Sequence, residues 1–157
     1  MAIEADLHVH TKYSFDCLLE PRTVIKIALM RGLSAIAITD HNTVKGSLAA
    51  IREASLVENL MVIPGIEVKT DMGDLIGLYV QEEIKSRDFY EVVDEIRRQD
   101  GLVVFPHPYS GHKGVIEDLA KCADVVEAMN GRCSHARNAR AFQLARNLGK
   151  PVIACSD

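Results

Sequence analysis

Short runs of apolar, mostly β-branched residues recur along the chain and alternate with amphipathic stretches. Such nearly continuous hydrophobicity is typical of strands that are covered on both faces. The buried strands predicted in this way are 35–39, 61–63, 102–105, 125–128 and 152–155. A further strand is predicted to end at His8 and His10. Segment 68–80 is predicted as two strands joined by a turn at 71–74.

Apolar positions spaced three and four residues apart predict helices over 89–96 and 141–148. Pro21 is expected to begin an earlier helix, because its missing N–H costs nothing at that position. The glycines expected just after helix ends are Gly32, Gly101 and Gly149. The repeated strand–helix order, with one inserted hairpin, predicts an α/β domain of largely parallel strands. The sheet is either open and doubly wound or closed into a barrel.

The composition suits one domain, because 157 residues of which 48% are hydrophobic can bury one sizeable core. A net charge of −4 without a basic stripe gives no indication of nucleic-acid binding, except as a possible substrate. Four irregularly spaced cysteines favour reduced thiols. No apolar stretch reaches the length of a membrane span, and no targeting signal is recognised, so a cytoplasmic protein is expected. The oligomeric state stays open.

Two histidines one residue apart are the first candidate for chemistry. Residues i and i+2 of a strand project from the same face, so His8 and His10 place two imidazoles side by side. This arrangement suits a shared divalent metal ion. The alternative is a pair of exposed histidines at a polar strand end.

Further polar side chains follow the carboxyl ends of the predicted strands. These residues are Asp40, His41, Glu67, His107, Asn130 and Asp157. Parallel α/β folds bring such strand ends to one face, where their active sites form. For each residue alone a cap or a turn is the simpler explanation; Asp40, for example, could cap a helix that begins near Thr43. Their coincidence at one edge favours a metal site.

The remaining histidines and basic residues carry less signal. His112 in a glycine-bounded loop and His135 at a helix start are both predicted to be exposed. Lys113 and Arg132 are candidates to contact an anionic substrate, and Arg132 is the stronger of the two. Arg137 belongs to the same group of loop and helix-start cations.

Several short motifs occur in a fixed order: Asp6-Leu7-His8-Val9-His10-Thr11, Ser14-Phe15-Asp16, Ile38-Thr39-Asp40-His41-Asn42, Pro64-Gly65-Ile66-Glu67, His107-Pro108 and Ser156-Asp157. Together they resemble the ordered motifs of the PHP (polymerase and histidinol phosphatase) superfamily. The resemblance implies one PHP domain over 1–157, folded as a distorted TIM-like barrel of about seven strands. It also implies two or three divalent metal ions at the carboxyl ends of the strands.

Carried over position by position, the resemblance implies eight metal ligands: His8, His10, Asp16, His41, Glu67, Asp74, His107 and Asp157. Asp74 stands where many relatives carry a histidine, and a carboxylate there would shift the metal preference from zinc towards manganese or iron. The family pattern continues Ser-Asp-x-His, whereas this chain stops at Asp157, so the resemblance implies truncation at the C-terminal end.

The activity implied is metal-dependent hydrolysis of a small phosphate ester, such as a nucleotide, by a phosphatase or phosphodiesterase. The candidate catalytic residues are His41, His107 and Asp40. Either histidine could act as a general acid instead of a ligand, and Asp40 could hold the free N–H of a neighbouring histidine. The alternative is a non-catalytic, metal-stabilised module of a larger protein. A third possibility, amidohydrolase-type C–N cleavage, shares the barrel and the ligand chemistry. The lysine position expected of such an enzyme is not recognised in this sequence.

Overall fold

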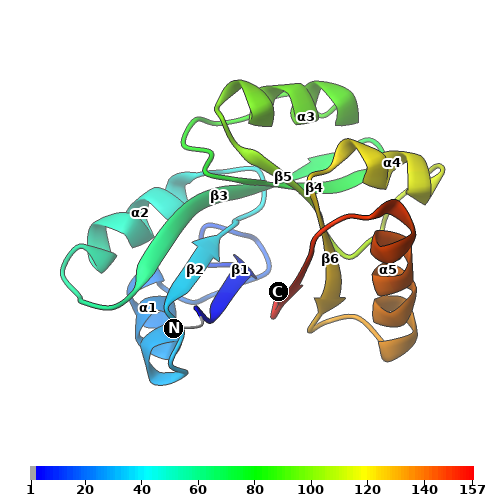
Figure 1. Cartoon of the computed structure of the whole chain (residues 1–157). Helices are drawn as coiled ribbons and strands as arrows, with labels where there is room; N and C mark the ends of the chain where they lie inside the picture. The colour runs from blue at the N-terminus through cyan, green and yellow to red at the C-terminus, as the bar shows by residue number, and fades with distance from the viewer. Residues whose placement is uncertain (1–2) are drawn as a thin grey trace.

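The computed structural model describes residues 3–157, which form a curved sheet with helices on its outer side (Figure 1). The strands are β1 (Ala5–Val9), β2 (Ala35–Ile38), β3 (Met61–Thr70), β4 (Gly73–Leu78), β5 (Leu102–Phe105), β6 (Val125–Asn130) and β7 (Val152–Cys155). The helices are α1 (Pro21–Met30), α2 (Lys45–Ala54), α3 (Phe89–Arg98), α4 (Ile116–Cys122) and α5 (His135–Leu148).

The sheet follows the chain order from β1 to β7. Strand β4 runs antiparallel to both of its neighbours, and the other adjacent pairs are parallel. Just beyond β7 the chain returns to β1, where the Asp157 N–H donates to the His8 carbonyl at 3.1 Å. The sheet therefore curls into a nearly closed, distorted TIM-like barrel, which confirms the predicted fold and excludes the open doubly wound alternative.

Strand β3 is longer than predicted. The sequence predicts a strand over 61–63 and a separate hairpin over 68–80, but a single strand runs from Met61 to Thr70. Regular pairing with β2 stops at Pro64, and antiparallel pairing with β4 starts at Gly65, so the proline lies where the partner strand changes. A Cβ at Gly65 would lie 3.1 Å from two carbonyl oxygens of neighbouring strands, which explains the glycine.

Most predicted helix signals are confirmed. Pro21 begins α1, and the apolar face of α3 is buried. Gly32 and Gly149 take left-handed backbone conformations after α1 and α5, with φ values of 76° and 64°. The expectation for Gly101 was wrong, because Asp100 takes that conformation after α3. Among helices of the described residues, none combines the length and apolar character that a membrane crossing requires.

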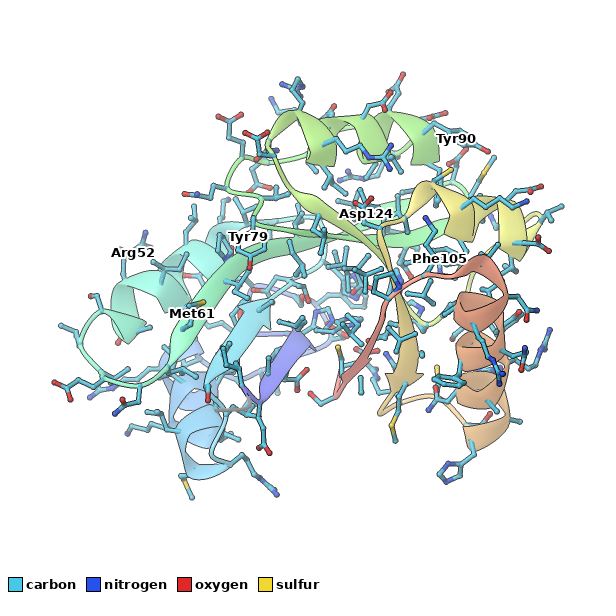
Figure 2. The ribbon with its side chains drawn as sticks, viewed as in Figure 1. Arg52, Met61, Tyr79, Tyr90, Phe105 and Asp124 are labelled. Carbon is cyan, nitrogen blue, oxygen red and sulfur yellow. The ribbon has the colours of Figure 1, made fainter. Side chains whose placement is uncertain are left out.

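The barrel interior separates an apolar layer from a polar one. Ile66 and Val68 pack in the core shared with the helices, so the alternation along β3 turns Glu67 towards the inside of the barrel. A second apolar cluster lines the inner face: Ala37, Ile63, Ile76, Leu78, Val104 and Val125. Figure 2 shows side chains filling the space inside the strands. Glu67 therefore lies on the inner face of the barrel, next along β3 from this apolar cluster towards the carboxyl ends of the parallel strands.

Candidate metal centre

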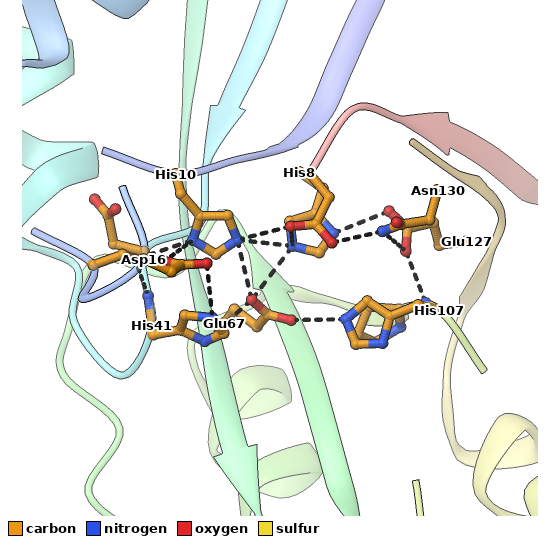
Figure 3. Close-up of polar contacts among 12 residues, drawn as sticks. His8, His10, Asp16, His41, Glu67, His107, Glu127 and Asn130 are labelled. Carbon is orange, nitrogen blue, oxygen red and sulfur yellow. Dashed lines mark hydrogen bonds and ion pairs between the residues drawn. The ribbon is translucent and has the colours of Figure 1, made fainter. Parts of the chain in front are cut away.

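One buried carboxylate is the centre of the site (Figure 3). Glu67, of which 1% is exposed, places Oε2 3.3 Å from His8 Nε2, 3.2 Å from His10 Nε2 and 3.2 Å from His41 Nδ1. Its Oε1 lies 3.2 Å from His107 Nε2. Residues from β1, from the loop after β2, from β3 and from the loop after β5 thus meet at one point, as the strand-end pattern predicts.

Two aspartates extend this group. Asp157 Oδ1 lies 3.6 Å from His8 Nε2 and 3.5 Å from His10 Nε2. Asp16 Oδ2 lies 3.7 Å from His41 Nε2. The donor atoms form three groups, in each of which all atoms lie within 4.8 Å of one another: His8, Glu67 and His107; His8, His10 and Asp157; His10, His41 and Glu67.

Asp74, at the beginning of β4, stands apart from these groups. It lines the same cavity, but it belongs to none of the three donor groups. One of its oxygens is buried without a hydrogen-bond partner among the described residues, and burial raises the pKa of this carboxyl. The full cavity lining consists of Phe15, Asp16, His41, Glu67, Lys69, Asp74, His107, Ser110, Asn130, Arg132, Cys133 and Asp157.

The electrostatics of the site favour a bound cation. Burial disfavours a charged imidazole, yet Asp157 and Glu67 raise the pKa of His10 to about 9. The pKa values of His8 and His107 are also raised against burial, mainly through facing carboxylates. Despite their own burial, the pKa values of Glu67 and Asp157 are held well below the usual range by the histidines. These carboxylates therefore need positive charge beside them.

The donor set fits a divalent metal ion. His8 Nε2 and His10 Nε2 lie 3.1 Å apart, and both face Glu67 Oε2. When both rings are neutral, their lone pairs and a carboxylate oxygen point to a common position. Mixed imidazole and carboxylate donors suit zinc, iron and manganese. Ligation by each of the eight expected residues stays a prediction.

Glu127 on β6 is a site residue that the sequence analysis missed. Its Oε1 lies 3.0 Å from His8 Nδ1. Its Oε2 accepts hydrogen bonds from the backbone N–H of His107 at 2.7 Å and from the side-chain amide of Asn130 at 3.0 Å. The Asn130 amide also donates to Asp157 at 2.9 Å. The available signal was an acid within the apolar run 125–128, which the sequence predicts as a buried strand, because a buried carboxylate needs partners.

Asp40 has a different partner from those expected. Its carboxylate is buried and accepts hydrogen bonds from the N–H and hydroxyl of Thr11, at 2.6 and 2.7 Å. Among the described residues its side chain forms no hydrogen bond with a histidine, and it does not cap α2, which has no side-chain cap. Ser14 from the same segment does orient histidines: its Oγ lies 3.0 Å from His10 Nδ1 and accepts the His41 N–H at 2.8 Å.

The expectation that His112 is exposed was wrong. Its ring lies 4.3 Å from that of Phe105 and 5.7 Å from that of His107, and its Nε2 lies 2.9 Å from the Pro106 carbonyl oxygen. A Cβ at Gly73 would come within 2.2 Å of His112 Nδ1, so the glycine makes room for the ring. Burial lowers the pKa of His112 to about 4, and the ring is neutral.

The candidate cations differ in position. Arg132 lines the cavity and donates to Asp16 at 3.1 Å and to Asp157 at 3.4 Å. Lys113 is exposed and is not part of the cavity lining. Lys69, which was not predicted, lines the cavity from β3, two residues beyond Glu67 and on the same face. His135 is exposed at the start of α5, as predicted.

Two solved structures share this fold. An amidohydrolase from Chromobacterium violaceum, solved with bound sulfate and no metal, matches with a TM-score of 0.81 at 18% identity, covering 98% of this chain and 87% of its own. A protein from Bifidobacterium adolescentis, provisionally named a metal-dependent phosphoesterase, matches with a TM-score of 0.80 at 16% identity over 100% and 88%. At these identities the likeness is one of fold.

Sequence relatives include two uncharacterized proteins of Methanocaldococcus jannaschii. MJ1587 is 38% identical over 119 residues, covering 69% of this chain and 69% of its own length. MJ0417 is 32% identical over 166 residues, covering 99% of this chain and 65% of its own length. The 5'-3' exoribonuclease Rnm of Salmonella typhimurium is 35% identical over 111 residues, covering 66% and 37%. The profile of the PHP domain matches residues 6–147, and the chain belongs to this family.

Proposed function

We propose that the protein is a metal-dependent hydrolase of phosphate esters that uses two or three divalent metal ions. The observation that carries the proposal is the meeting of four histidines around Glu67 at the carboxyl-end mouth of a barrel. The solved neighbour named as a metal-dependent phosphoesterase and the exoribonuclease relative support phosphoester chemistry. The chain spans about two thirds of the two archaeal relatives and about a third of the exoribonuclease.

The residues that would hold the ions are those predicted: His8, His10, Asp16, His41, Glu67, Asp74, His107 and Asp157. Zinc, manganese and iron all accept these donors. When bound, such ions lower the pKa of water and neutralise charge on phosphoryl oxygens. Glu127 keeps the Nδ1 proton of His8 in place, which leaves Nε2 free to face the cavity.

Other side chains of the cavity would handle the substrate. Arg132 and Lys69 supply positive charge for phosphate oxygens, and the Arg132 fork can bind two oxygens at once. His41 and His107 both line the cavity, and either can donate a proton to the departing oxygen if it is not held as a ligand. Asp40 acts indirectly, because it fixes Thr11 next to His10. A small phosphorylated compound such as a nucleotide is the proposed substrate.

The test combines elemental analysis with a panel of phosphoesters assayed after loading with manganese, zinc or iron. Turnover should disappear with a chelator and return when the metal is restored. Glu67→Gln should lower kcat/KM at least about 100-fold, which is about 2.7 kcal/mol, because the shared charge is removed. Glu117→Gln on the exposed side of α4 is the matched control. A metal-loaded protein that melts higher than the metal-free form but hydrolyses no ester would support the non-catalytic module instead.

A further inference from the structure

Phe15 is an exposed aromatic ring at the rim of the metal-centre cavity. It is 83% exposed, and its ring stacks on that of His41 with a centroid separation of 4.9 Å and an interplanar angle of 19°. Every other side chain that the described residues contribute to the cavity lining is charged, polar or a thiol. The site thus combines a strongly polar floor with one flat apolar surface.

The position of this ring is fixed by its neighbours in the chain. Ser14 contacts His10 and accepts the His41 N–H, and Asp16 accepts a hydrogen bond from Arg132. Both residues that flank Phe15 are therefore held in the site by polar contacts from other elements. An exposed phenyl ring held in this way is preorganised to accept a second ring without the cost of ordering a loop.

We propose that Phe15 is a stacking platform for a planar ring in the substrate, so that the site selects phosphoesters that carry an aromatic or heteroaromatic group. The inference rests on the proposed phosphoesterase function and names its substrate class. Arg132 and Lys69 line the same cavity and match the phosphate, whereas Phe15 matches the uncharged, flat part of the ester. Aromatic side chains stack on such rings with little dependence on the identity of the ring.

Leu18 provides a matched control from the same loop. It is 94% exposed and is not part of the cavity lining, so it shares with Phe15 the exposure of a large apolar side chain but not the position. The metal-loaded protein, Phe15→Ala and Leu18→Ala are compared on adenosine monophosphate, phenyl phosphate and glycerol phosphate. The first two distinguish a ring that lies beyond a sugar from a ring that is attached directly to the phosphate.

We expect Phe15→Ala to lower the ratio of kcat/KM for a ring-bearing ester to that for glycerol phosphate about 10-fold, and Leu18→Ala to leave this ratio unchanged. Damage to His41 alone would lower all three activities together, so an unchanged ratio in Phe15→Ala overturns the platform. No turnover by the unaltered protein overturns the phosphoesterase function instead. In that case the binding of adenosine monophosphate and of glycerol phosphate, measured by calorimetry, still tests the platform. If Phe15→Ala weakens the binding of both compounds equally, the platform is overturned.

Discussion

At the residue scale, the site depends on carboxylates that are almost fully buried. Glu67 and Glu127 are each 1% exposed. Burying an ionised carboxylate without partners would destabilise the fold by roughly several kcal/mol. Each is compensated by histidine rings or backbone N–H groups on other strands. Such a dense group of polar side chains inside a barrel is better explained by a function than by a contribution to stability.

Glu127→Gln tests whether the carboxylate behind His8 controls metal binding. The amide cannot match the charge that accepts the His8 Nδ1 proton and the His107 N–H, so the ring loses its fixed tautomer. We expect metal affinity to fall about 10- to 100-fold, with the barrel still folded. Competition with a chelating dye measures the affinity, and Glu117→Gln is again the exposed control. Unchanged affinity in Glu127→Gln would contradict this role.

Residue type and position predicted most of the side chains that meet here, but not the contacts that support them. His8, His10, His41, His107 and Asp157 stand at strand ends, where a sequence pattern suffices to place them. Glu127 was missed because its strand is defined by apolar neighbours, and the partner that makes it necessary lies 119 residues away. The acid within an apolar run was a local signal, but the long-range hydrogen bond that explains it cannot be seen in the sequence.

At the element scale, the first turn of α2 packs directly on the buried Asp40. A Cβ at Gly46 would lie 1.7 Å from Asp40 Oδ2 and 2.7 Å from Thr11 Oγ1. Helix propensity alone predicts that Gly46→Ala stabilises the protein by about 1 kcal/mol. The close approach predicts the opposite sign, because the added methyl group must displace the Asp40–Thr11 pair.

We therefore expect Gly46→Ala to lower the free energy of unfolding by about 1–3 kcal/mol, as overpacking does elsewhere. Urea denaturation of the metal-free protein measures the change. Arg52→Ala, at an exposed position of the same helix, should change the stability by less than about 0.5 kcal/mol. A more stable Gly46→Ala variant would show that α2 does not press on Asp40 in solution.

The same scale shows where strand prediction fails. Helices α1, α3 and α5 were predicted because periodicity, Pro21 and Gly149 are local signals, whereas α4 was not predicted. The continuity of β3 was not predicted either, because Pro64 and Gly65 usually interrupt strands. Here the change of partner from β2 to β4 occurs between these two residues, and only the assembled sheet explains why both are tolerated.

At the scale of the whole molecule, the site joins the beginning of the chain to its end. His8 on β1 faces Asp157 after β7, and Glu67 and His107 come from the middle of the barrel. Ions bound here would hold the strands on both sides of the β1–β7 seam. We expect saturation with zinc or manganese at about 100 times the dissociation constant to add about 2.7 kcal/mol to the free energy of unfolding.

Thermal denaturation with and without a chelator measures this gain. In Glu67→Gln, which retains the surrounding histidines but loses the central charge, the same metal concentration should raise the melting temperature much less. Equal stabilisation of the two proteins would place the binding away from the barrel mouth.

The charge balance of the barrel also makes metal binding depend on pH. Without metal, Asp157 and Glu67 raise the pKa of His10 to about 9, so this ring carries a proton at pH 7. The pKa values of His8 and His107 are raised as well. A metal ion binds the neutral ring, so binding must release these protons, and affinity must increase as pH rises towards about 9.

Calorimetric titration with zinc in two buffers of different ionisation enthalpy counts the protons, and we expect at least about one per ion at pH 7. His135→Ala, which removes an exposed histidine, should leave that number unchanged. Binding without proton release at pH 7 would mean that the histidines around Glu67 are neutral before the metal arrives, and that another source of charge stabilises the buried carboxylates.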